Sequence, residues 1–175
     1  MPKKPATRSC QEREPQLKTI RDEIAARYRA GHDRRVADVL RKFGNVETYP
    51  SQRMIVLHRA ASSKAAVDAA LKQLQRSGDV EFVTPVLLDV ESNTRQVLTD
   101  EIVLRLKPGC TERSLAALKA EHGIRIGRRN KYEPTQYIVK VPKPSGTQTL
   151  DIARSLDRSA DVEFACPNFL SEPKR

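Results

Sequence analysis

The chain has 175 residues, of which 38% are hydrophobic, 31% charged and only 5% aromatic, with no Trp. This composition is typical of a soluble globular protein of one or two small domains with an aliphatic core. No apolar run approaches the roughly 20 residues that a membrane helix needs, so no membrane partner is expected. The formal net charge of +10 favours an acidic partner, although Lys and Arg are spread along the whole chain.

The N-terminal segment MPKKPATRSCQERE carries basic residues but no apolar stretch, so as written it is not a secretory signal. The expected location is therefore cytoplasmic for the chain as it stands, and secreted if the chain is part of a longer precursor. Residues 1–20 lack hydrophobic periodicity and are predicted to form a mobile N-terminal arm.

The two halves of the chain repeat one another. The segments 79–88 (DVEFVTPVLL) and 161–170 (DVEFACPNFL) are identical at six of ten positions. Segments 22–31 and 100–109 also match, because each contains Asp-Glu-Ile, an Arg three positions later and a Gly four positions after that. Ordered matches of this kind indicate a duplicated structural unit. We therefore expect a first module over residues 21–90, a linker over 91–98, a second module over 99–170 and a tail over 171–175.

The second module predicts the order of elements. Alternation over 101–107 places Ile102, Leu104 and Leu106 on one face, which indicates a strand. The next predicted element is a helix, which Thr111 caps and Gly123 ends. The remaining predicted elements are strands over 124–128 and 136–141, a helix over 149–159 and a strand over 162–165. The order βαββαβ is that of a ferredoxin-like unit, a four-stranded antiparallel sheet with both helices on one face.

The first module follows the same plan, with one conflict. Residues 23–29 have helical propensity from Ala and Arg, but the repeat aligns them with the strand over 101–107, so a strand is predicted. The other predicted elements are a helix that Asp33 caps and Gly44 ends, strands over 46–49 and 54–59, a helix over 63–77 and a strand over 80–83. The expected fold class is α+β, with two tandem ferredoxin-like βαββαβ modules.

The second module resembles a known family at both of its ends. Its opening segment 100–109 (DEIVLRLKPG) and its closing segment 160–170 (ADVEFACPNFL) are similar to the fervidolysin-like N-terminal prodomain of subtilisin-family serine proteases. That family typically closes on a segment such as VEYAEPNY, and Cys166 stands where it usually has an acidic residue. The resemblance covers the second module fully and the first through the repeat.

This resemblance implies a propeptide-like protein, acting as intramolecular chaperone, inhibitor or both. Its partner would be a subtilisin-like serine protease domain, in cis in a longer precursor or in trans. The outer sheet face would dock on the protease through Val103, Arg105, Lys107, Ile138 and Lys140. The segment after the last strand would lie in the substrate cleft, pairing through main-chain hydrogen bonds. This protease-binding tail comprises Asn168, Phe169, Leu170, Ser171, Glu172, Pro173, Lys174 and Arg175.

No pattern in the sequence predicts catalysis. The glycine-rich contexts that surround the Asp, His and Ser of subtilisin-type enzymes are missing, and the three histidines (His32, His58 and His122) are scattered. No phosphate-binding loop, zinc-protease motif or nucleophile elbow occurs. The three cysteines (Cys10, Cys110 and Cys166) have no metal-site spacing, and Cys166 is expected to be a buried core thiol. We expect no enzyme activity, no metal and no cofactor.

Two alternative functions stay open. The same βαββαβ order underlies RNA-recognition modules, which stack bases on aromatic side chains of the central strands. No aromatic occurs at the outward positions expected here, which in the first module are Ala25, Arg27, Arg29, Ile55, Leu57 and Arg59. A basic tandem RNA-binding module is therefore possible but less favoured than protease binding. The second alternative is a non-inhibitory protein-interaction scaffold.

Overall fold

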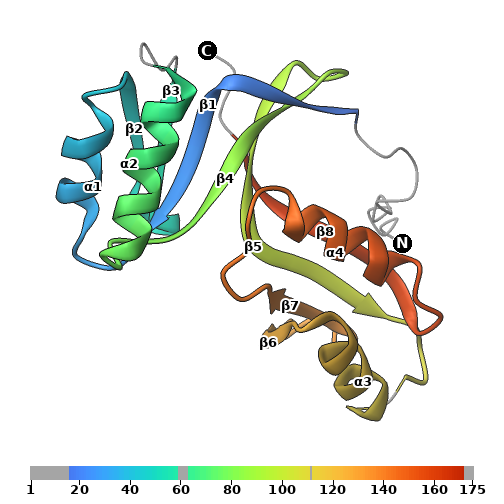
Figure 1. Cartoon of the computed structure of the whole chain (residues 1–175). Coiled ribbons are helices and arrows are strands. Elements are labelled where there is room, and N and C mark those ends of the chain that lie inside the picture. The colour runs from blue at the N-terminus through green and yellow to red at the C-terminus, as the bar shows by residue number, and fades with distance from the viewer. Residues whose placement is uncertain (1–15, 59–62, 111, 172–175) are drawn as a thin grey trace.

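The computed structural model describes residues 16–58, 63–110 and 112–171, and each half of the chain forms a βαββαβ unit (Figure 1). The elements of the first unit are β1 (Leu17–Tyr28), α1 (Asp33–Leu40), β2 (Asn45–Tyr49), the 3-10 turn η2 (Pro50–Gln52), β3 (Met54–His58), α2 (Lys64–Arg76) and β4 (Val80–Asp89). Those of the second are β5 (Thr94–Leu106), α3 (Glu112–His122), β6 (Arg125–Arg129), β7 (Gln136–Lys140), α4 (Gln148–Asp157) and β8 (Val162–Ser171). The predicted α+β fold class with tandem ferredoxin-like modules is confirmed.

The strands are antiparallel, in the order β2-β3-β1-β4 in the first unit and β6-β7-β5-β8 in the second. Strands β4 and β5 form a hairpin that joins both halves into one 8-stranded sheet. The carboxylate of Asp89 shapes its turn by accepting hydrogen bonds from the backbone N–H of Glu91 and Ser92, at 3.0 and 3.4 Å. The expected linker is corrected accordingly, because residues 94–98 belong to β5.

Both ends of the described chain also differ from expectation. Residues 17–20, expected in a mobile arm, belong to β1 and pair with β4 as far as Thr19. The rest of that arm up to residue 15, the tail over 172–175 and the predicted cap Thr111 lie outside the described residues. Within the described ranges, no helix is long and apolar enough to cross a membrane.

Both first strands are interrupted at the same point of the repeat. The pairing of β1 with β4 shifts register between Thr19 and Ile24, and that of β5 with β8 shifts between Leu98 and Ile102. The repeated Asp-Glu dipeptides fall inside these two irregularities, where a bulged strand redirects its side chains. The match that identified the repeat therefore marks a conformational feature of each unit.

Strand β1 shows why helical propensity failed for residues 23–29. It pairs with β3 on one side and β4 on the other, and Ala25 and Ala26 are 0% and 1% exposed. Both faces of this central strand are covered, and alanines leave room for the layers above and below. Burial and pairing outweigh an intrinsic preference of well under 1 kcal/mol per residue. The strand predicted from the repeat is confirmed.

Three apolar clusters form the core. One lies under α1 and α2 and one under α3 and α4, where Ile102, Leu104 and Leu106 face inward as predicted. The third lies on the opposite face of the first sheet and contains Ala25, Met54, Val56, Phe82, Val86 and Val97, with Ile20, Tyr49 and Leu170 packed against it. Because Val97 and Leu170 come from the second unit, this cluster joins the two units.

The third cluster corrects the outward residues expected in β3. Ala25 pairs with Val56, so Met54 and Val56 share its face, whereas Ile55 and Leu57 lie in the core under the helices. A shift of one residue moves every side chain of a strand to the other face. The residues expected to point outward, Ile55 and Leu57, are each one position away from those that do, Met54 and Val56.

Several element ends also differ from the prediction. Helix α1 ends at Leu40 rather than at Gly44, and Asp33 is its first residue instead of its cap. Strands β4 and β8 run on past Pro85 and Pro167, although they were expected to end at 83 and 165. Both prolines lie beside the register shifts, where a residue without an N–H group is tolerated in a strand.

Candidate functional site: the outer face of the second sheet

The face of the second sheet that points away from α3 and α4 has an apolar centre. Val103 of β5 pairs with Ile138 of β7 and Cys166 of β8, and all three side chains are half-buried. Arg105 is the next outward residue of β5, opposite Phe164 of β8. We call this surface the outer face and define it by Glu101, Val103, Arg105, Gln136, Ile138, Lys140, Phe164 and Cys166.

The charged groups of the outer face are compensated within it. The Nη2 and Nε atoms of Arg105 lie 2.9 and 3.2 Å from carboxylate oxygens of Glu133 and Glu163. Lys140 Nζ lies 3.4 Å from Oε1 of Glu101. These basic side chains therefore frame the apolar centre instead of presenting uncompensated positive charge. This arrangement favours a partner recognised by apolar contact over one recognised by charge alone.

Four of the five predicted docking residues lie together on the outer face: Val103, Arg105, Ile138 and Lys140. Lys107 does not join them, because it follows the end of β5 and its Nζ donates a hydrogen bond to the carbonyl of Ala160 at 2.7 Å. Among the described outward positions of the central strands β5 and β7 there is no aromatic residue. Phe164, which sequence reasoning missed, lies on the edge strand β8.

Cys166 is not the core thiol that was expected. It lies opposite Val103 on the outer face and is disulfide-bonded, whereas Cys110 is free. The cause is a register shift between Arg105 and Leu106, which lets both Val162 and Ala165 point into the core. Regular alternation from Val162 would have turned Cys166 inward. A bulge of this kind leaves no clear mark in the sequence.

The first part of the predicted tail is not a free chain end. Phe169, Leu170 and Ser171 pair with β5, opposite Leu98, Val97 and Gln96. The backbone carbonyl of Asn168 accepts a hydrogen bond from Thr99 Oγ1 at 2.6 Å, and Asn168 Nδ2 donates to Glu101 at 3.1 Å. The segment is extended as expected, but an edge of β5 within the molecule satisfies its backbone groups. Glu172, Pro173, Lys174 and Arg175 lie outside the described residues.

The two copies of the repeat use their outer faces differently. In the first unit Phe82 is 2% exposed, and the guanidinium of Arg27 lies 5.3 Å from the centre of its ring. Arg27 also forms a buried ion pair with Asp100 of the second unit. The corresponding residues of the second unit, Phe164 and Arg105, are only half-buried. The outer face of the first sheet is covered within the molecule, and that of the second stays accessible.

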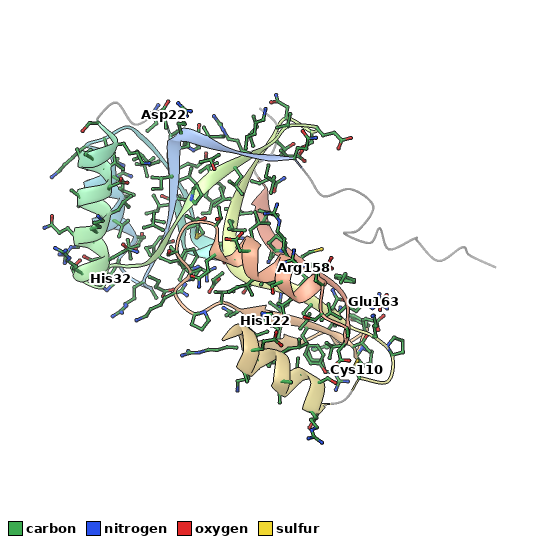
Figure 2. The ribbon with its side chains drawn as sticks, turned by 45° about the vertical axis from the view of Figure 1, so that its right-hand side comes forward. Asp22, His32, Cys110, His122, Arg158 and Glu163 are labelled. Atoms are coloured by element: carbon green, nitrogen blue, oxygen red, sulfur yellow. The ribbon has the colours of Figure 1, made fainter. Side chains whose placement is uncertain are left out.

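The histidines form no shared site in the described part of the chain. His32 and His122 belong to different units (Figure 2), and His58 lies 3.6 and 3.3 Å from carboxylate oxygens of Glu23 and Glu47. Over the same residues, no group of three or more His, Cys, Asp or Glu side chains is placed to hold a metal ion.

The contacts of His32 place an Asp, a His and a Ser together without forming a catalytic triad. His32 Nδ1 lies 2.6 Å from Asp79 Oδ1. The Ser77 hydroxyl donates a hydrogen bond to Oδ2, the other carboxylate oxygen of Asp79. Arg35 Nε lies 3.3 Å from the same carboxylate. In a triad the serine contacts the histidine, which acts as its base. Here both contact the aspartate, so the cluster ties the start of α1 to the turn before β4.

This cluster predicts a pH dependence of stability. Hydrogen bonds from the Ser77 hydroxyl, which has the larger effect, and from His32 lower the pKa of the Asp79 carboxyl below its ordinary value of 3.8. A carboxyl whose pKa is lower in the folded state stabilises the fold above the unfolded-state pKa and loses that contribution as pH falls through the folded one. We expect the wild type to lose more stability than Asp79→Asn between pH 6 and pH 3, both measured by urea unfolding. Equal losses would contradict this assignment.

The chain has distant structural likenesses among solved proteins. No protein-family model and no curated protein matches the chain. A solved structure that is similar is the small subunit of acetolactate synthase from Thermotoga maritima, with 13% sequence identity and a TM-score of 0.28, covering 87% of this chain and 96% of that one. A likeness this weak carries no argument about function.

Proposed function

We propose that this chain is a propeptide-like, non-enzymatic protein that binds a subtilisin-like serine protease domain and serves as its folding aid, its inhibitor or both. The observation that carries this proposal is the difference between the two outer faces. Among the described residues, the outer face of the second sheet is the less buried of the two, and the second module is the one whose opening and closing segments resemble the protease prodomains.

The composition of the outer face fits a protein partner. Val103, Ile138 and Phe164 supply apolar area, and the pairs that Arg105 and Lys140 form with carboxylates surround it. Protein interfaces commonly combine an apolar centre with a polar rim. These residues lie on paired strands, so binding of a partner requires little further ordering of their backbone. A protease surface with a complementary apolar patch would dock here.

Inhibition would require a further segment in the substrate cleft. Because β5 holds residues 168–171, only the residues from Glu172 onward are proposed to enter the cleft. An extended segment can add to the edge of an enzyme cleft through main-chain hydrogen bonds, with alternate side chains filling pockets. In this proposal the outer face provides docking and the segment after Ser171 provides inhibition.

The two roles can be separated by a truncation. We expect the full chain to bind and inhibit a subtilisin-like protease, and a chain ending at Ser171 to bind it but no longer inhibit. Binding would be measured by surface plasmon resonance on a protease whose catalytic Ser is replaced by Ala, and inhibition by peptide hydrolysis with the active enzyme. Failure of both chains to bind any member of a panel of such proteases would contradict the proposed function. Equal inhibition by both chains would contradict the role of the segment after Ser171.

A further inference from the structure

A groove of about 810 Å³ lies where the two units meet. The first unit contributes Arg29, Gly78 and residues 80–82 to its walls, and the second contributes Asp100, Arg125, Lys140 and the loop over 141–145. This loop is fixed against β4, because Ser145 forms a bridge to Val83 and Thr84 Oγ1 donates to the Gly146 carbonyl at 3.3 Å. The groove is therefore a built feature of the packing between the units.

The carboxylates of the groove are neutralised by arginines that do not line it. Asp100 is paired with Arg27, and Glu81 Oε1 lies 2.9 Å from Arg53 Nη1. One lining cation, Lys140, is compensated by Glu101 at 3.4 Å. Neither lining carboxylate therefore offsets the positive charge of the remaining lining residues.

Three cations in the groove have no such compensation. The side chains of Arg29, Arg125 and Lys143 are exposed, and within the described part of the chain no hydrogen bond or ion pair engages them. The guanidinium of Arg29 lies 3.6 Å from the point that a Cβ of Gly78 would occupy, and Gly78 has a φ of +77°. The guanidinium therefore lies at ordinary contact distance from this backbone position, and the positive φ of Gly78 is a conformation that favours glycine.

We propose that the groove binds a small ligand with two or more phosphate groups, held by Arg29 of the first unit and by Arg125 and Lys143 of the second. The three positive charges line one groove, and an anion bound between them would lower their mutual repulsion. Arginine matches phosphate oxygens with two parallel hydrogen bonds, and lysine adds a point charge. The volume is in the range of sites for small ligands. Such a ligand would bridge the two units, and its binding does not depend on any protease.

The test uses inorganic pyrophosphate and the full chain. Isothermal titration calorimetry at low salt should show binding to the wild type and at least about tenfold weaker binding to the double variant Arg125→Ala/Lys143→Ala, because charge-assisted hydrogen bonds are lost. The matched control is Arg128→Ala/Lys131→Ala. It removes the same charge from exposed residues that line a different hollow, so its affinity should stay within about twofold of the wild type.

Four results would overturn this site, three from calorimetry and one from thermal unfolding. The first is no pyrophosphate binding by the wild type, and the second is an equal loss of affinity in both double variants, which would indicate a response to net charge alone. The third is binding of citrate as tight as that of pyrophosphate, because the arginine geometry would then not select phosphate. Pyrophosphate should also raise the melting temperature of the wild type more than that of Arg125→Ala/Lys143→Ala. Equal shifts would count against the site as well.

Discussion

Replacing Phe82 with Ala is expected to lower the free energy of unfolding by about 3–5 kcal/mol, whereas Phe164→Ala should cost about 1 kcal/mol. The two phenylalanines occupy the same position of the repeat. Phe82 is 2% exposed in the cluster that joins the units, but Phe164 lies half-buried on the outer face of the second sheet. Removing Phe82 leaves a cavity in a packed interior, and removing Phe164 exposes a surface that already meets solvent.

Urea unfolding of both variants would measure this difference. Phe164→Ala is the matched control, since it makes the same chemical change at the equivalent repeat position. Similar losses of stability in the two variants would mean that the outer faces are equally covered. That result would remove the structural reason for assigning docking to the second unit alone.

Arg27→Ala is expected to be the other strongly destabilising change, costing about 3–5 kcal/mol. The Arg27 and Asp100 side chains are only 7% and 14% exposed, so removing the arginine leaves a carboxylate in the junction between the units without its cation. The guanidinium contact with the Phe82 ring would be lost as well. Breaking one side of a buried ion pair is costly because the remaining charge was desolvated for its partner.

Two further variants make this prediction specific. Arg41→Ala breaks an exposed pair with Asp38, whose side chains are 61% and 69% exposed, and should cost about 0.5 kcal/mol or less. Replacing both buried partners, as in Arg27→Met/Asp100→Leu, should recover most of the stability lost in Arg27→Ala, since no isolated charge remains. If Arg27→Ala cost no more than Arg41→Ala, the pair would not hold the two units together.

Local pattern and the repeat were enough to predict the elements of the fold. The alternation of Ile102, Leu104 and Leu106 gave the inward face of β5, and the repeat gave the strand character of residues 23–29 against their helical propensity. The positions of turn-forming residues predicted where most loops lie. These features depend on neighbours close in sequence or on a second copy of the same segment, so they can be recognised without knowing the packing.

The features that escaped prediction depend on contacts between distant segments. The burial of Phe82 and Met54 depends on how the second unit packs. The pairing of residues 169–171 depends on the extension of β5 at its N-terminal end, where residues 96–98 belong to the strand. The outward position of Cys166 follows from one register shift in β8. A bulge or a docked unit changes which face of a strand is covered, while the sequence of that strand keeps the same alternation.

The most direct test of the proposed docking surface is the affinity of the full chain for a catalytically inactive subtilisin-like protease, compared with that of two aspartate variants. Ile138→Asp adds a charge to the apolar centre of the outer face, and Ala69→Asp adds the same charge to an exposed position of α2. We predict that Ile138→Asp weakens binding by at least about tenfold and that Ala69→Asp leaves it unchanged. Equal affinities of both variants and the wild type would contradict docking through this face.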